Sequence, residues 1–159
     1  MSTRAYPTTN MRLNREFIKH VNNSPYAELL GMRLTQAHDG FARVRMPYHE
    51  KLLQPFGRVH GGAIYSMADY ALGWAAYSVV DRLEEVTTVE MKMNYIGTIH
   101  VGELIADATV LHLGSRTILA EVIVKTNRDK LIAKAMGTFM RLHHNGDSHP
   151  QKLKAQRNK

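Results

Sequence analysis

The sequence predicts an α+β fold in which one long apolar helix packs against an antiparallel sheet of about six strands. Two observations support this fold. Residues 63–80 form a run rich in Ala, Ile, Met, Leu, Trp and Val, and apolar residues recur with a period of two in the segments that follow it. Strands and helices do not alternate along the chain, and the sequence contains no internal repeat. A doubly wound nucleotide-binding fold is therefore not expected.

Two short helices and a hairpin are predicted before the long helix. The first helix spans residues 12–22, where apolar residues recur near helical spacing. The second starts at Ser24, an N-cap residue followed by proline, and stops at Gly31. Two strands follow, joined by a turn whose Asp-Gly pair is typical of hairpins, and a loop leads to the long helix. These strands and the loop are residues 32–37, 41–46 and 47–59.

Four strands are predicted beyond the long helix. The first begins at Val89 and alternates apolar with polar residues, as a half-buried strand does. The last is apolar on both faces, because Met136, Met140 and Leu142 lie on its second face. Such strands are covered on both faces or lie at a subunit contact. The four strands are residues 89–95, 104–113, 118–125 and 131–142.

A single domain with two polar ends accounts for the 159 residues. We expect an N-terminal extension over residues 1–23, made of a loose end and a short helix, a folded domain over 24–143, and a basic, disordered tail over 144–159. The net charge of +7 is concentrated at the ends: residues 1–15 and 144–159 each carry +3, which leaves +1 for the body. This distribution is typical of solvated ends, so no nucleic-acid partner is predicted.

The absence of cysteine excludes disulfides, cysteine nucleophiles and thiolate metal sites, and it fits a reducing interior. Residues 1–10 lack the apolar core of a signal peptide, and no apolar run reaches membrane-spanning length. The nine histidines do not form a zinc pattern. The sequence therefore predicts a cytoplasmic protein with no metal and no membrane partner.

The long helix carries one acid, Asp69, within its apolar run. A helix this apolar should be buried on nearly all sides, and a buried carboxylate is costly unless it is paired or has a chemical role. Asp69 is therefore either a structural carboxylate that caps a loop or pairs with an arginine, or a functional group. The aromatic residues of the same helix either shape a pocket or fill the core, which helical spacing favours for most of them. They are Tyr65, Tyr70, Trp74 and Tyr77.

His60, Gly61 and Gly62 lie where the long helix begins. The N–H groups at a helix N-terminus are unpaired and carry a partial positive charge, so they can stabilise an oxyanion on a carbonyl under attack. The two glycines either allow a ligand to approach the backbone or merely permit a tight turn into the helix. His60 either orients the loop or contacts a substrate.

Gly61 and Asp69 are separated by about 12 Å along a helix axis. One carbonyl group cannot touch both groups of the same chain. If both act on one substrate, two antiparallel helices related by a two-fold axis must supply them. The functional interpretation therefore predicts a homodimer with two shared sites.

The run His60-Gly61-Gly62 followed by Asp69 resembles the signature of PaaI-like hotdog-fold acyl-CoA thioesterases. The resemblance extends from about Ser24 to Leu142. It implies the hotdog fold, a long central helix wrapped by a curved antiparallel sheet, with protomers joined through their sheets into dimers that commonly pair into tetramers. It also implies an acyl-CoA substrate, water as the second substrate, and no cofactor. The segments that carry it further are Tyr26–Met32, Thr88–Ile96 and Gly114–Thr117.

The resemblance also implies roles for individual residues. By position, the N–H of Gly61 polarises the thioester carbonyl, and Asp69 of the partner chain attacks it or activates water. Thr88 matches a hydroxyl that helps hold the water or the acid. Gln54 stands where the family usually has Asn; it offers the same amide chemistry on a longer stem.

The remaining matched residues imply contacts with substrate. Gly114, Ser115 and Arg116 match a turn that is often near the CoA moiety, and His60 and Gly62 at the start of the helix are candidates to contact the substrate. Arg58, Lys92 and Arg116 are candidates to pair with CoA phosphates, although each alone is also a typical solvated surface charge. The alternative function is a non-catalytic acyl-CoA-binding hotdog domain that serves as a sensor or regulator.

Overall fold

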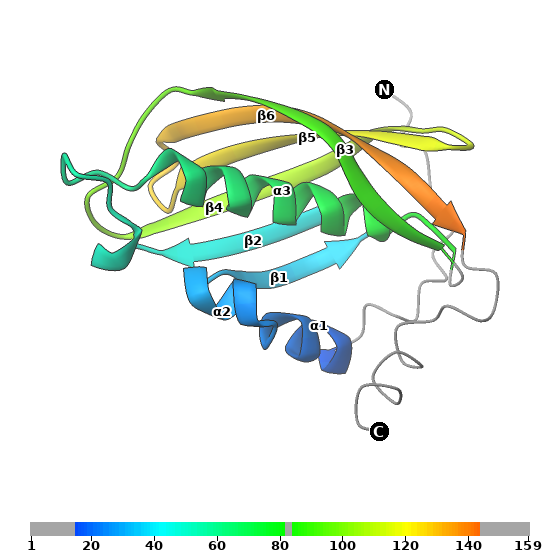
Figure 1. The fold of residues 1–159 in the computed structure, drawn as a ribbon, viewed down its shortest axis with the longest axis horizontal. Helices are drawn as coiled ribbons and strands as arrows, with labels where there is room; N and C mark the ends of the chain where they lie inside the picture. The colour runs from blue at the N-terminus through cyan, green and yellow to red at the C-terminus, as the bar shows by residue number, and fades with distance from the viewer. Residues whose placement is uncertain (1–14, 82–83, 144–159) are drawn as a thin grey trace.

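The computed structural model describes residues 15–81 and 84–143. Its single antiparallel sheet has six strands in the order β1-β2-β4-β5-β6-β3, and the sheet curves around helix α3 (Figure 1). The predicted fold class is thus confirmed. The loose N-terminal end and the basic tail fall in residues 1–14 and 144–159, which lie outside the described residues.

The elements follow the predicted order. They are α1 (Arg15–Asn22), α2 (Pro25–Leu30), β1 (Arg33–His38), β2 (Phe41–Pro47), the 3-10 helix η2 (Glu50–Leu52), α3 (Gly61–Tyr77), β3 (Glu84–Tyr95), β4 (Glu103–Leu113), β5 (Thr117–Thr126) and β6 (Leu131–His143). In the described part of the chain, no helix has the length and apolarity needed to cross a membrane.

The segment before α3 folds as the turn residues predict. Helix α2 stops at Gly31, which has a left-handed φ of 71° and donates its N–H to the carbonyl of Glu28. Between β1 and β2, Asp39 and Gly40 have φ values of 47° and 80°. Two consecutive positive φ values match the twist of a tight hairpin, which explains the Asp-Gly pair.

Strand β3 begins earlier than predicted, at Glu84 rather than Val89. The pairing register with β6 shifts between Thr88 and Glu90, so Val89 is the extra residue of a β-bulge. A bulge inverts the side-chain alternation of a strand. The period-two pattern that is clear after Val89 therefore cannot be continued back to Glu84.

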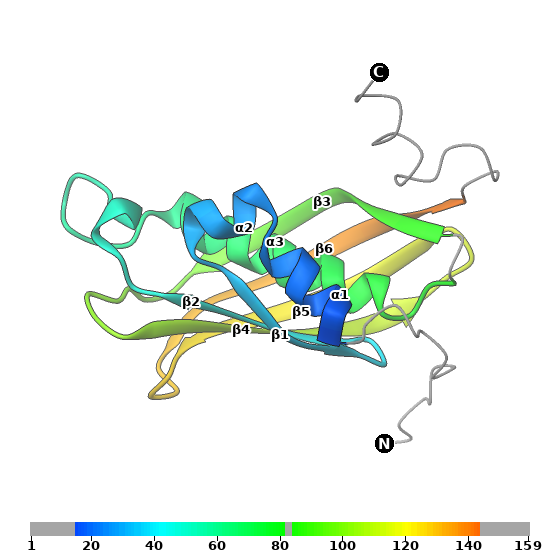
Figure 2. The same ribbon diagram turned by 90° about the horizontal axis from the view of Figure 1, so that it is seen from below.

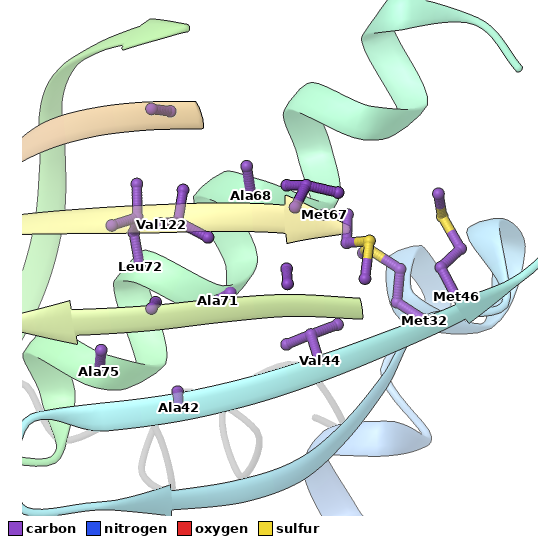
Figure 3. Close-up of a cluster of buried hydrophobic side chains, with 14 of the residues drawn as sticks. Met32, Ala42, Val44, Met46, Met67, Ala68, Ala71, Leu72, Ala75 and Val122 are labelled. Atoms are coloured by element: carbon purple, nitrogen blue, oxygen red, sulfur yellow. The ribbon is translucent and has the colours of Figure 1, made fainter. Parts of the chain in front are cut away.

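The core lies between the concave face of the sheet and one side of α3 (Figure 3). Val44 of β2 and Val122 of β5 are fully buried there, as is Leu72 of the helix. The opposite side of α3 is open: Tyr65 exposes 38% of its surface and Asp69 is only half-buried. The expectation of a helix buried on nearly all sides is therefore wrong for the single chain, because the sheet wraps one side only.

Helix α3 ends at Tyr77 rather than at the predicted Val80. The hydroxyl of Ser78 donates to the carbonyl of Ala75 across 2.7 Å and accepts the N–H of Gly40 across 2.8 Å. Ser78 is buried, so these bonds tie the end of α3 to the β1–β2 turn. The helix stops because a tertiary contact is made there, and the apolar run alone does not reveal it.

The two edges of the sheet differ. Beside β1, the amide of Asn22 pairs with the backbone of Leu34: Nδ2 donates to the carbonyl oxygen across 3.0 Å, and Oδ1 accepts the N–H across 2.7 Å. Helix α1 thereby covers this edge (Figure 2). No described strand pairs with the outer edge of β3. Strand β3 is therefore the edge that can accept another strand.

The convex face of the sheet is divided into a charged and an apolar part. On β2, β4 and β5, ion pairs connect Arg43 with Asp107 and Lys125 with the same Asp107. On β6, Met136, Met140 and Leu142 expose 44%, 44% and 37% of their surfaces. The subunit contact predicted for this apolar part stays a prediction.

Candidate active site

The N-terminus of α3 is built by His60 and the two glycines. His60 is the N-cap, and its Nδ1 accepts the N–H of Gly62 across 2.8 Å. A Cβ on Gly62 would lie 2.9 Å from this nitrogen, so only glycine leaves room for the imidazole to fold back. Because Nδ1 is an acceptor, the proton of the neutral ring belongs on Nε2. His60 thus orients the start of the helix, one of the two roles left open by the sequence.

The N–H of Gly61 is left as a donor at this N-terminus. No acceptor among the described residues reaches it. The carbonyl of the same peptide unit, that of His60, accepts the N–H groups of Ala63 and Ile64 at 3.0 and 3.4 Å. Hydrogen bonds to the carbonyl polarise the peptide and strengthen its N–H as a donor. The arrangement suits stabilisation of an oxyanion.

Two tyrosines flank this donor: Tyr65, one of the helix aromatics named above, and Tyr95, which the sequence pattern did not single out. The ring of Tyr95 lies 3.3 Å from the position of a Cβ on Gly61, and its hydroxyl donates to the Gly61 carbonyl across 3.2 Å. Tyr65 donates to the carbonyl of Met91 across 3.0 Å. Burial raises the pKa of the Tyr95 phenol, and the nearby Tyr65 adds to the rise. The alternation along β3 places Tyr95 with the inward-facing residues, and this was the sequence signal that could have identified it.

The other aromatic residues of α3 are partly buried and pack against the core, the role that helical spacing favours. Trp74 packs edge-to-face against Phe17, Tyr70 and Tyr77 with ring centroids 5.5 to 5.9 Å apart. Phe17 belongs to α1, so this cluster fixes α1 on the helix. Tyr65 is the exception, because it lies on the open side.

Asp69 lies on the open side of α3, facing β3. Thr88, the residue before the bulge, donates its hydroxyl to Oδ1 of Asp69 across 2.8 Å. Within residues 15–81 and 84–143, this is the carboxylate's one hydrogen bond, and no cation pairs with it. The arginine pair of the structural alternative is thus absent from the described chain. The carboxylate keeps Oδ2 for another partner.

A different carboxylate, Glu84, is the buried one. Its side chain is 2% exposed, and Arg141 binds both of its oxygens, with Nε to Oε1 at 3.0 Å and Nη2 to Oε2 at 2.7 Å. This hydrogen bonding raises the pKa of the Arg141 guanidinium. The sequence pattern did not indicate this pair, because Glu84 lies outside the predicted strand and the two residues are far apart in sequence.

Gln54 belongs to a tight loop that leads to α3. Its side-chain Oε1 accepts the N–H of Phe56, and its backbone N–H donates to the carbonyl of Arg58 across 2.8 Å. The loop is tied to the helix start, since the N–H of His60 donates to the carbonyl of Leu52 across 2.7 Å. With its oxygen used by the loop, the NH₂ group of Gln54 has no partner among the described residues.

The predicted phosphate-binding cations do not gather in one chain. Arg58 is exposed in the loop before α3, and Lys92 is exposed on the convex side of β3, opposite Met136. Arg116 is exposed in the turn Gly114–Arg116, at the end of the sheet away from the N-terminus of α3. In the part of the chain that the structure describes, no three metal-ligating side chains gather either.

Comparison with known proteins agrees with this fold. Residues 56–133 match the thioesterase superfamily. A Halobacterium salinarum protein provisionally named an esterase is 36% identical over 115 residues, which cover 69% of this chain and 76% of that protein. The 1,4-dihydroxy-2-naphthoyl-CoA hydrolase of Listeria monocytogenes is 29% identical over 105 residues, covering 66% of this chain and 85% of that one.

A solved structure of a similar protein has the same fold. The PaaI protein of the E. coli phenylacetic acid degradation operon superposes with a TM-score of 0.71 at 25% identity, covering 78% of this chain and 88% of that protein. Sequence and structure therefore agree. The chain belongs to the thioesterase superfamily, a family of thioester hydrolases, and has the hotdog fold of its PaaI-like members.

Proposed function

We propose that this protein hydrolyses an acyl-CoA thioester at two sites shared between the subunits of a homodimer. The observation that supports this best is the unused hydrogen-bonding capacity of two groups on α3. Asp69 is a half-buried carboxylate with one hydrogen bond, and the Gly61 N–H at the start of the same helix has no acceptor among the described residues. The CoA ester is supported by the name of the Listeria relative, which is a CoA-thioester hydrolase.

The proposed reaction uses the two groups on one carbonyl. The thioester oxygen accepts the N–H of Gly61, which stabilises the negative charge that develops on it. Asp69 of the partner either attacks the carbonyl carbon or takes a proton from a water molecule that attacks it. The carbon–oxygen bond forms, the carbon–sulfur bond breaks, and CoA leaves as a thiolate that takes up a proton. If Asp69 is the nucleophile, a mixed anhydride forms, and a water molecule then hydrolyses it, which releases the acid and restores the carboxylate. Thr88 holds one oxygen of Asp69, so that Oδ2 faces the reacting atoms. No cofactor enters this scheme.

The homodimer follows from the separation of the two groups and from the sheet edges. About 12 Å along the helix axis separates Gly61 from Asp69, so one chain cannot bring both to a single carbonyl. Because Asn22 pairs with the edge of β1, the β3 edge is the one available to a second copy. Pairing of β3 with its copy across a two-fold axis would place the open sides of two α3 helices together.

The test is release of free thiol from short, long and aromatic acyl-CoAs. Asp69→Asn keeps the shape and removes the base, so we expect a large loss of turnover. Asp39→Asn is the matched control, because Asp39 lies exposed in the hairpin turn, where asparagine is equally suited. Turnover unaffected by Asp69→Asn would contradict the proposal. Binding of acyl-CoA without any thiol release would favour the sensor.

A further inference from the structure

Arg141 connects three segments at the end of the sheet away from the N-terminus of α3. Its guanidinium binds Glu84 with two of its nitrogens, and the third, Nη1, donates to the carbonyl of Gly114 across 2.9 Å. Its backbone N–H donates to the carbonyl of Arg116, also across 2.9 Å. One residue thus holds both ends of the turn Gly114–Arg116 against the start of β3.

The turn is shaped closely around this attachment. The N–H of Gly114 donates to the carbonyl of Thr117 across 2.9 Å, and a Cβ on Gly114 would lie 2.9 Å from the same oxygen. A side chain at Gly114 would therefore displace the backbone. The tip itself is open: Ser115 and Arg116 are exposed, and no acidic side chain in the described ranges pairs with Arg116. The structure thus presents one free cation on a fixed turn.

We propose that Arg141 is a positioning residue for CoA binding, which it supports by fixing the Gly114–Arg116 turn while Glu84 fixes Arg141. This inference rests on the proposed acyl-CoA substrate, and it takes the exposed Arg116 of the turn as the cation that binds a CoA phosphate. A flexible turn would have to be ordered when a phosphate binds, and that entropy would reduce affinity. The attachment removes this cost before CoA arrives. Arginine is required, because only a planar fork can bind the Glu84 carboxylate and the Gly114 carbonyl together.

A positioning role and a purely structural role of Arg141 differ in the substrates that they affect. CoA carries its phosphates at the end remote from the thioester, whereas an S-acyl-N-acetylcysteamine keeps the thioester and lacks the phosphates. A residue that acts through the turn should influence the first substrate only. A residue that merely stabilises the fold should influence both alike.

Two variants displace the turn by independent routes. Arg141→Lys keeps a positive charge beside Glu84 and loses the fork, and Gly114→Ala leaves the ion pair intact and forces the backbone away from the Thr117 carbonyl. For both, we expect the Kd for CoA, measured by calorimetry, and the KM for acyl-CoA to rise about tenfold, as for loss of one charge-assisted contact. We expect kcat for acyl-CoA to stay within about twofold of the wild type. The kcat and KM for the N-acetylcysteamine thioester should also stay within about twofold.

Arg116→Ala completes a double-mutant cycle. If Arg141 acts through the turn, Arg116→Ala combined with Arg141→Lys weakens CoA binding no more than either single change. Losses that multiply would overturn the inference, as would wild-type CoA affinity in Arg141→Lys or an equal loss on both thioesters. If Arg141→Lys does not fold, Gly114→Ala decides the question by the same readouts.

Failure of the proposed function gives a different result. A wild type that hydrolyses neither thioester but binds CoA in an Arg141-dependent manner would refute the hydrolase and support the positioning role. A wild type that hydrolyses both thioesters and whose CoA affinity does not depend on Arg141 would support the hydrolase and refute the positioning role. A wild type that binds no CoA would overturn both.

Discussion

Asp69 and Glu84 are carboxylates on the two elements that face each other along the open side of the fold, α3 and β3. Glu84 is 2% exposed, both of its oxygens bind Arg141, and Oε2 also accepts the N–H of Asp81. Asp69 is half-buried and accepts one hydrogen bond, from Thr88. A buried charge with every oxygen paired stabilises an arrangement of segments. A carboxylate held by one oxygen keeps the other for chemistry, so incomplete pairing, rather than burial, distinguishes the candidate catalytic acid.

The largest expected effect is on turnover at Asp69. Asp69→Asn should lower kcat by about 10²- to 10⁴-fold, the range for loss of a positioned acid or base. Because the carboxylate has no ion pair among the described residues, the free energy of unfolding should change by less than about 1 kcal/mol. Thiol release and urea unfolding on the same preparation check both values. A strongly destabilised Asp69→Asn would mean that Asp69, like Glu84, is structural.

The opposite pattern is expected at Glu84. Glu84→Ala leaves Arg141 without its partner, and breaking a buried pair in this way costs about 3–5 kcal/mol of unfolding free energy. Glu84→Gln, which keeps the volume and one acceptor, should cost less. Denaturant unfolding measures the cost, and the turnover of an N-acetylcysteamine thioester per folded molecule should be retained. Wild-type stability in Glu84→Ala would remove the contrast between the two carboxylates.

Thr88 is the one partner of Asp69 in the described part of the chain, and its hydroxyl can be removed separately. Thr88→Val deletes the donor and keeps the branched shape, so kcat should fall about tenfold, as for a lost hydrogen bond to a charged group. Thr88→Ser restores the hydroxyl and should recover most of the turnover. Steady-state kinetics on one acyl-CoA suffice. If Thr88→Ser is as slow as Thr88→Val, the hydroxyl does not hold the carboxylate.

The smallest effect concerns the other component of the proposed site, the N-terminus of α3. His60→Ala removes the N-cap and should lower the unfolding free energy by about 1 kcal/mol. His60→Ser supplies another capping oxygen and should restore most of it. Thermal or urea unfolding detects the difference. If both variants match the wild type in stability, His60 is not needed as a cap, and a role in substrate contact gains weight.

Local sequence signals predicted the parts of this fold that local interactions determine. Gly31 and the Asp39-Gly40 turn were placed correctly because their backbone conformations require those residue types. The start of β3 was missed, since the bulge at Val89 breaks the alternation on which strand prediction depends. Helix α3 was predicted too long because Ser78 ends it through a bond to Gly40, which is distant in sequence.

The sequence indicated which residues to consider for the candidate site, but it did not indicate what surrounds them. The His-Gly-Gly run and Asp69 stood out because glycines and an acid are rare in so apolar a segment. The environment of Asp69 was predicted wrongly, because an apolar composition does not reveal which side of a helix the sheet leaves open. The contacts of Tyr95, Thr88 and Arg141 come from strand register, which the sequence pattern fixed only in part.

Gly61 and Asp69 are proposed to act on one carbonyl from two different chains, and mixing two inactive variants tests this directly. Asp69→Asn removes the acid, and Gly61→Pro removes the N–H while keeping a residue suited to the first helical position. Each homodimer should have lost activity by about 10²-fold or more. Co-expressed heterodimers, isolated with two affinity tags, should contain one site with both groups intact, so we expect about half of the wild-type turnover. Heterodimers as inactive as the two homodimers would place both groups in one chain and refute the shared site.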